Sequence, residues 1–316
     1  MHVHHARAGE VVSRTATVVA IGNFDGVHRG HRELLRAGRA AARPGEPLAV
    51  LTFEPLPQAW FRPQAAPARL TPEALKLEWL AEAGVELAWS MPFDEALAGL
   101  GAEDFVRLVL RDGLAARVVV VGDDFRFGRG REGDVGTLAA LGAEHGFELI
   151  VVPPVVDDGE RISSTRVRAA LDAGDLDTAA RLLGRPFAMA GTVAHGSKLG
   201  RKLGYPTANL PLEGRPSPLA GVFAVRARLP AGPWRDAIVS LGTRPAVGGG
   251  ETLLEVHLFD FEGDLYGKRL EVEFVEKLRD ELDFENLDAL VAQMDRDAER
   301  ARGALAARSL EAAEPR

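Results

Sequence analysis

The sequence predicts two domains of different class: a doubly wound parallel α/β domain, then an antiparallel β-barrel or sheet with one C-terminal helix. Three observations predict this. The 316 residues exceed what one domain usually holds. Short β-branched runs alternate with amphipathic stretches from Thr15 to about Val152. After Gly184-Arg-Pro186, strand-like segments bounded by Gly and Pro follow one another instead. The predicted boundary therefore separates residues 1–184 from residues 185–316.

The first half is expected to hold five strands, each a short apolar run: Thr17–Ile21, Leu48–Thr52, Leu87–Ser90, Arg117–Val121 and Glu148–Val152. Helical spacing of apolar residues predicts helices over Pro72–Ala83 and Ala102–Arg111. Asp134 is the expected N-cap of a helix that runs to about Glu144. Ser163 opens a short helix, and another spans Asp175 to Leu183. The first five residues are expected to be a frayed end.

The second half is expected to be mainly antiparallel, because its strands follow one another without intervening helices. One helix from Asn286 to about Leu305 packs against them, and the polar tail from Ser309 to Arg316 is expected to be loose. The predicted strands are Phe187–Val193, Gly221–Ala227, Ala237–Leu241, Leu253–Phe259 and Arg269–Val275.

Composition excludes several classes of function. The chain has no cysteine, which rules out disulfides, thiolate nucleophiles, Cys-ligated zinc and iron–sulfur clusters. The net charge of −8 opposes non-specific attraction to nucleic acid and to anionic lipid. We find no apolar run long enough to span a membrane and no signal-peptide core. We therefore expect a cytoplasmic protein that binds neither nucleic acid nor membrane, and we see no obligate protein partner.

The most informative segment of the first half is Val18-Val-Ala-Ile-Gly-Asn-Phe-Asp-Gly-Val-His-Arg-Gly-His31, a strand, a turn and a helix start. At the carboxyl end of a first strand, backbone amides and the helix N-terminus favour an anion. His28 and His31 lie three apart and can project from one side of that first turn, where they would offset charge growing on a phosphate. Two surface histidines would show the same spacing, but the whole pattern is more specific. Its other candidate residues are Gly22, Phe24, Asp25 and Gly30.

A second candidate phosphate site follows in Arg161-Ile-Ser-Ser-Thr-Arg-Val-Arg168, another helix start. Hydroxyls, free amides and a guanidinium would converge there, as they do where proteins grip phosphate oxygens. Ordinary helix capping would explain the hydroxyls equally well. Combined with the histidine segment, the cluster predicts a clamp for the outer phosphates of ATP, formed by Arg161, Ser163, Ser164, Thr165 and Arg168.

The second half carries a glycine- and base-rich segment from Gly191 to Asn209. Its glycines would let the backbone approach phosphates, and its basic side chains would supply positive charge, although a solvated loop has the same composition. Thr207 and Asn209 alternate across Ala208, so in an extended segment both oxygens face one side and could serve as neutral ligands for hydrated Mg²⁺. The phosphate-binding candidates are Gly196, Lys198, Gly200, Arg201 and Gly204.

One carboxylate of the second half is a candidate general base. In the strand from Leu253 to Phe259, alternation places Leu254, Val256 and Leu258 on one face and Glu255 and His257 on the other. A solvent-facing glutamate on a half-buried strand is the other interpretation of this pattern.

These residues resemble, across nearly the full length of the chain, the prokaryotic bifunctional riboflavin kinase/FMN adenylyltransferase family, also called FAD synthetases. The first-half matches are the segment from Gly22 to His31, Thr52-Phe-Glu-Pro55, Val121-Gly-Asp-Asp-Phe-Arg-Phe-Gly128 and Ile162-Ser-Ser-Thr165. The second-half matches are Gly200-Arg-x-Leu-Gly-Tyr-Pro-Thr-Ala-Asn209, Gly242-Thr-Arg-Pro245, Glu255 to Phe261, Tyr266-Gly267 and Leu278-Arg279. The resemblance implies a nucleotidyltransferase-type, Rossmann-like sheet followed by a riboflavin-kinase barrel.

The resemblance also implies two reactions: riboflavin and ATP give FMN and ADP, and FMN and a second ATP give FAD and pyrophosphate. Glu255 matches the catalytic glutamate of the kinase, and Thr207 and Asn209 match its Mg²⁺ ligands. The matched motifs also imply flavin contacts from Asp124 and Phe127 in the adenylyltransferase half and from Arg279 in the kinase half.

The chain departs from the family pattern at three positions. Leu56 stands where a histidine is usual, and Ser240 and Ala246 replace a usual Asn and Thr. Every proposed charge-handling residue is present, so we expect both activities. Two alternatives stay open: a catalytically silent flavin-binding regulator, and a monofunctional adenylyltransferase with an inert β-domain.

Overall fold

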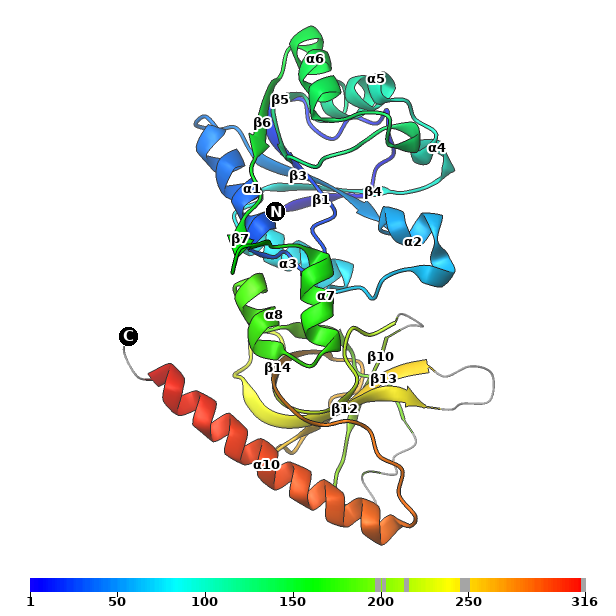
Figure 1. Cartoon of the computed structure of the whole chain (residues 1–316), viewed down its shortest axis with the longest axis vertical. Helices are drawn as coiled ribbons and strands as arrows, with labels where there is room; N and C mark the ends of the chain where they lie inside the picture. The colour runs from blue at the N-terminus through cyan, green and yellow to red at the C-terminus, as the bar shows by residue number, and fades with distance from the viewer. Residues whose placement is uncertain (197–199, 201–202, 213–215, 245–250, 314–316) are drawn as a thin grey trace. The chain divides into compact units, whose positions relative to one another are not determined.

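The structure is a computed structural model that describes residues 1–196, 200, 203–212, 216–244 and 251–313 (Figure 1). Packing divides the chain into two units. Unit 1 comprises Met1–Pro67 and Glu73–Ser164, and unit 2 comprises Ala68–Pro72 and Thr165–Arg316. Packing places the two helices before Gly184, over residues 164–183, almost wholly in unit 2. The boundary near Gly184 therefore stays a prediction about the functional halves of the chain.

Unit 1 contains a six-stranded, wholly parallel sheet in the order β1-β4-β3-β2-β5-β6. Its strands are β1 (His2–His4), β2 (Thr17–Ile21), β3 (Leu48–Glu54), β4 (Leu87–Pro92), β5 (Ala116–Gly122) and β6 (Glu148–Val152). The central strands are almost continuously apolar because both faces of a parallel sheet are covered by helices. All five predicted strands are present, and a short hairpin of β7 (Val156–Asp157) and β8 (Glu160–Arg161) follows them.

The helices of unit 1 carry buried residues, with the exception of the short α2. They are α1 (Arg29–Ala41), α2 (Pro57–Phe61), α3 (Glu73–Glu82), α4 (Glu95–Ala98), α5 (Ala102–Phe105) and α6 (Val135–His145), with short 3₁₀ turns at η1 (Pro63–Ala65) and η3 (Arg129–Arg131). The predicted helix over Ala102–Arg111 begins as α5 and continues as the π-helix η2 (Val106–Arg111). Asp134 caps α6 as predicted, since its side chain accepts the Thr137 amide.

The N-terminal residues are not a frayed end, which corrects the prediction. β1 pairs in parallel with β4, in the register His2↔Leu87, and so covers an edge of the sheet. The indole of Trp89 donates to the Ala6 carbonyl at 2.7 Å and anchors the segment that follows. The pattern His-Val-His-His lacks the apolar run of a buried strand, so its pairing could not be inferred from periodicity.

An ion pair in unit 1 makes its stability sensitive to acid. The guanidinium of Arg117 and the backbone amide of Arg43 hydrogen-bond the Glu46 carboxylate and lower its pKa to about 2. Because this pKa lies below the usual value of 4.5, the stabilisation is complete above that pH and is lost as the pH falls toward 2. We expect Glu46→Gln to lower the melting temperature of unit 1 at pH 7 and to match the wild type near pH 2. A difference that stays constant across a pH series of thermal melts would contradict this.

Unit 2 is a nearly closed antiparallel barrel with helices outside it. The six strands run in the order β10-β13-β12-β11-β14-β9. They are β9 (Ala188–Thr192), β10 (Ala208–Pro211), β11 (Gly221–Arg228), β12 (Arg235–Arg244), β13 (Glu251–Leu258) and β14 (Arg269–Arg279), preceded by α7 (Ser164–Asp172) and α8 (Leu176–Leu183). The two edge strands meet where the Ala194 amide donates to the Asn209 carbonyl at 2.8 Å. This bridge closes the barrel that the sequence predicts.

The C-terminal helix α10 (Leu287–Ala313) is longer than predicted and lies alongside the barrel (Figure 1). Ala301 and Leu305 are fully buried against Val222 and Phe259. Ser309 and the residues after it belong to the helix up to Ala313, so the expected loose tail is wrong for them. Arg308 on this last part pairs with Asp177 of α8.

Candidate active sites

The first candidate site is the turn that joins β2 to α1. Three residues of this turn lie in the left-handed region: Phe24 (φ 51°), Gly26 (φ 87°) and Val27 (φ 41°). Two of these are side-chain-bearing residues for which that conformation is strained, and the strain is held by packing, since Phe24 and Val27 are fully buried. Asp25 is only 2% exposed. The turn is therefore a rigid piece of backbone at the carboxyl edge of the sheet.

His28 and His31 are brought together at the start of α1. His28 is the N-cap, and its Nδ1 accepts the His31 backbone N–H at 3.2 Å. This bond places the proton of neutral His28 on Nε2, which leaves a donor for an anion. The two imidazoles stack with centroids 3.6 Å apart and planes 13° apart. The His28 ring also lies 3.2 Å from where a Cβ on Gly30 would be, so a side chain there would crowd the ring.

The second predicted cluster lies at the start of α7. Within unit 1, the Ser164 hydroxyl donates to the Asp25 carbonyl at 2.9 Å. Arg161 is held by two carboxylates, Asp123 at 3.1 Å and Asp124 at 2.8 Å. Ser163 precedes the helix, while Thr165 and Arg168 belong to unit 2, where Arg168 Nε donates to the Ala68 carbonyl at 2.5 Å.

The second candidate site is built on one row of residues across the barrel. Strand register places Asn209, Glu255, Ser240, Val222 and Arg279 directly opposite one another on β10, β13, β12, β11 and β14. Paired residues in antiparallel strands put their side chains on the same face. We call this set the cross-strand row. It faces away from the barrel core, because the alternate residues of β13, Leu254, Val256 and Leu258, are buried as predicted.

A cavity of about 320 Å³ lies over the cross-strand row, a size typical of small-molecule sites. Its polar lining includes Thr207, Ser240, Glu255 and Arg279. Its apolar lining includes Leu203, Ile238 of β12, Phe284 of the loop before α10, and Leu290 and Met294 of α10. The cavity therefore combines an apolar lining with carboxylates, among them Glu255.

A second, smaller cavity of about 80 Å³ adjoins the first at Thr207, which lines both. Its other lining residues include Val193, Pro206, Phe261 and Tyr266. Close to this junction, the Asn209 side chain is 6% exposed, and its Oδ1 has no hydrogen-bond partner among the described residues. A buried oxygen without a donor is costly unless a cation or other ligand completes it. The residue types and this oxygen fit a hydrated Mg²⁺.

Comparison with known proteins decides the family. A family model described as FAD synthetase matches residues 11–166, and one described as riboflavin kinase matches residues 183–305. The bifunctional riboflavin kinase/FMN adenylyltransferase of Escherichia coli (strain K12) is 46% identical over 281 residues, which cover 89% of this chain and 90% of that protein. The chain belongs to this family. Its namesake from Pseudomonas fluorescens is 47% identical over 294 residues, 92% of this chain and 94% of that protein.

A solved structure shares the fold of the bifunctional family member described here. A crystal structure described as a macrolide-efflux protein from Streptococcus pneumoniae matches with a TM-score of 0.82 and 33% identity, over 95% of this chain and 98% of that one.

Within the described parts of this chain, no helix has the length and hydrophobicity to cross a membrane.

Some residues at positions that match the family's motifs are buried and do not lie open to a ligand. Phe127 is 6% exposed and belongs to the core of unit 1, while Phe125, stacked on it with centroids 5.5 Å apart, is half-buried. Leu56, which stands where the family usually has histidine, is buried at the start of α2. Gly196, Gly200 and Gly204 lie within the described residues, whereas Lys198, Arg201 and Ala246 lie outside them.

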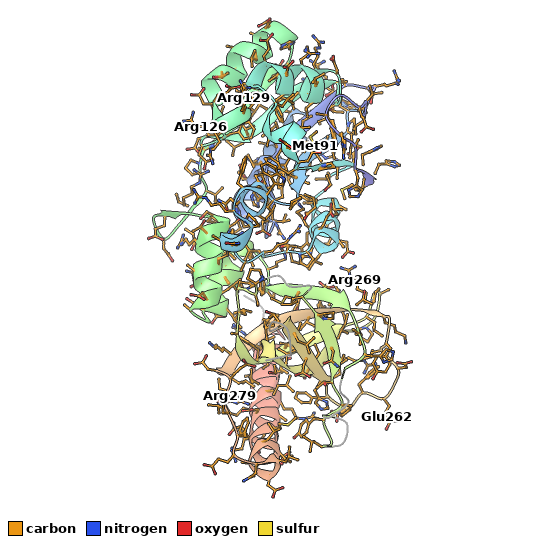
Figure 2. All side chains as sticks on the ribbon, turned by 90° about the vertical axis from the view of Figure 1, so that its right-hand side faces the viewer. Met91, Arg126, Arg129, Glu262, Arg269 and Arg279 are labelled. Carbon is orange, nitrogen blue, oxygen red and sulfur yellow. The ribbon has the colours of Figure 1, made fainter. Side chains whose placement is uncertain are left out.

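Sequence reasoning missed several residues that line the larger cavity of unit 2 or support its walls. Tyr205 donates to Asp295 at 2.5 Å, and burial together with this hydrogen bond raises the pKa of the Tyr205 phenol to about 12. Asp297, 1% exposed, accepts two nitrogens of Arg279 at 2.8 Å, and that arginine lies beside α10 (Figure 2). The sequence did carry a signal for this pair. Asp297 is an acidic residue on the apolar face of α10, four residues before Ala301 and eight before Leu305.

An aromatic face at the carboxyl edge of the unit 1 sheet was also missed. Trp60, Phe61 and Phe93 form edge-on pairs with centroids between 4.8 and 5.7 Å apart. Phe61 is 59% exposed, so this aromatic group is open to solvent on one side. The segment Gln58-Ala-Trp-Phe61 carries this signal, which lies next to the matched Thr52–Pro55 motif.

Proposed function

We propose that the chain makes FAD in two steps, as a riboflavin kinase in unit 2 and an FMN adenylyltransferase centred on the β2–α1 turn. The first step transfers the γ-phosphoryl group of ATP to riboflavin, giving FMN and ADP. The second transfers an adenylyl group from another ATP to FMN, giving FAD and pyrophosphate. One observation carries the proposal: Thr207 lines both of the cavities described above, and Glu255 lines the larger one. Two adjoining cavities with a carboxylate near the junction suit transfer between two bound substrates.

In the kinase step, the flavin ring would occupy the larger cavity against Ile238, Phe284 and Met294. Its ribityl chain would then reach toward Glu255, which would take the proton of the terminal hydroxyl as that oxygen attacks the γ-phosphorus. Thr207 and Asn209 would hold Mg²⁺ together with the nucleotide phosphates, and this cation would neutralise charge on the phosphates. Gly196, Lys198, Gly200, Arg201 and Gly204 remain the predicted phosphate-binding residues.

The metal assignment predicts a specific effect of Gly196→Ala. A Cβ on Gly196 would overlap the Asn209 carboxamide, so that buried side chain must move. Because metal affinity depends on ligand placement, we expect the Mg²⁺ concentration for half-maximal FMN formation to rise about tenfold. The conversion of supplied FMN to FAD should keep its Mg²⁺ dependence. An unchanged Mg²⁺ titration for FMN formation would contradict the role of Asn209.

In the adenylyl step, the nucleophile is the FMN phosphate, which is already ionised, so no general base is required. Catalysis then consists of alignment and stabilisation of the charge that develops on the ATP phosphates. We assign this to His28, His31 and the α1 N-terminus, with Ser164, Thr165 and Arg168 as further phosphate contacts. Arg161 would exchange its carboxylate partners for phosphate oxygens. Asp124 and the exposed face of Trp60 and Phe61 would contact the flavin, and the buried Phe127 would support the half-buried Phe125 that stacks on it.

One assay tests the proposal against its alternatives. Purified protein is incubated with riboflavin, ATP and Mg²⁺, and FMN and FAD are resolved by chromatography. We expect FMN to form first and FAD to follow. Formation of neither product would favour a flavin-binding regulator, and FAD made only from supplied FMN would favour a monofunctional adenylyltransferase.

A further inference from the structure

A buried lysine lies on the inward face of α3 and has no part in the chemistry above. Lys76 is 0% exposed and sits among Leu75, Trp79 and Leu80, which are the buried apolar residues of that helix. Lysine is almost never fully buried, because its ammonium loses hydration that only well-placed polar partners restore. A charge at this position therefore needs a reason beyond filling space.

Lys76 begins a chain of two hydrogen bonds that ends on the backbone of the adenylyltransferase site. Its Nζ donates to Thr52 Oγ1 at 3.1 Å, and Thr52 Oγ1 donates to the Asn23 carbonyl at 3.1 Å. Asn23 lies between Gly22 and Phe24, where β2 has ended and the strained turn toward His28 begins. Thr52 is also 0% exposed, so water does not substitute for either partner.

The protonation chemistry fixes the direction of both bonds. An ammonium has donors and no acceptor, so the Thr52 oxygen must accept from Lys76. The single hydroxyl proton of Thr52 is then left for the Asn23 carbonyl. The carboxylate of Glu54 stands beside the ammonium, with its Oε2 3.9 Å from the Lys76 Nζ. A neutral apolar residue at position 76 would free the hydroxyl to rotate away from the turn.

We propose that Lys76 is a positioning residue for adenylyl transfer: acting through Thr52, it fixes the Asn23 carbonyl and hence the turn that presents His28. The inference rests on the proposed adenylyltransferase function of this turn. In this role Lys76 acts through the Thr52 hydroxyl, which a structural counter-charge to Glu54 would not require.

The test is a double-mutant cycle in the full-length protein. We expect Lys76→Met and Thr52→Val each to lower kcat for FMN-to-FAD conversion about tenfold, with the KM for FMN nearly unchanged. The double variant should lose no more than either single one, since both break the same chain. Thr52→Ser, which keeps the hydroxyl, should retain wild-type kcat. Leu75→Met, an uncharged change on the same buried face, controls for packing.

Riboflavin phosphorylation in the same molecules reports the folded fraction and should stay at wild-type level. If Lys76→Met does not fold, the comparison of Thr52→Val with Thr52→Ser decides the proposal. Equal activity in those two variants, or additive losses in the cycle, would overturn the positioning role. A wild type that makes no FAD from FMN would instead overturn the proposed function.

Discussion

Replacing Glu255 with alanine is expected to lower the rate of FMN formation by about 10²- to 10⁴-fold, the usual contribution of a general base. The carboxylate lies in the cross-strand row, opposite Asn209 and Ser240, and lines the larger cavity. Removing it leaves the cavity walls in place, so riboflavin should still bind. The rate is measured by quantifying FMN by chromatography under saturating ATP and Mg²⁺.

Two variants separate loss of the base from general damage. Glu255→Gln keeps the size and polarity of the side chain and should be nearly as slow as alanine, because an amide takes up no proton. Glu276→Ala removes an exposed carboxylate from β14 and should have no effect. Conversion of supplied FMN to FAD should continue in all three variants. A Glu255→Gln enzyme with full kinase activity would show that another group accepts the proton.

Replacing His28 with alanine is expected to reduce FAD formation by about 10²- to 10³-fold, the loss seen when a donor to developing charge is removed. FMN should accumulate in the same reaction, because the kinase residues are untouched. The substitution also removes the α1 N-cap, which costs about 1 kcal/mol of stability and should leave the protein folded.

His28→Asn distinguishes the two roles of this residue. Asparagine is a good N-cap and can accept the His31 amide, but it carries no imidazole. If the imidazole stabilises phosphate charge, His28→Asn restores the melting temperature and leaves FAD formation slow. Recovery of FAD formation by asparagine would show that capping was the whole effect. Loss of both activities in folded His28→Ala protein would contradict the assignment of two separate sites.

Features set by residues close in the sequence were predictable, whereas the register between paired strands was not. Asp134 as a cap and the alternation around Glu255 follow from spacing within a few residues. β10 was missed because four residues that end in Pro211 give no periodic signal. Only pairing between distant strands shows that Asn209 lies opposite Glu255. The cavity walls on α10 depend on the same long-range packing.

At the β2–α1 turn, too, the sequence predicts local spacing but not the contacts that depend on the fold. Spacing predicts that His28 and His31 share one side of a helical turn, and the stacked rings confirm it. It does not predict that a histidine caps the helix, since Ser, Thr, Asp and Asn are the usual caps. Lys76 left a readable signal, a lysine on the apolar face of a predicted helix, but its partners come from a strand and become apparent only in three dimensions.

Asn209 joins two properties of unit 2 in a single residue. Its backbone carbonyl accepts the hydrogen bond from Ala194 that joins the two edge strands, β9 and β10, and its side chain presents the buried oxygen suited to a cation. A ligand that binds this oxygen therefore favours the closed barrel over an opened one by mass action. Substrate occupancy and barrel integrity are thus thermodynamically linked, so an enzyme with bound nucleotide should resist opening at the β9–β10 seam more than an empty one.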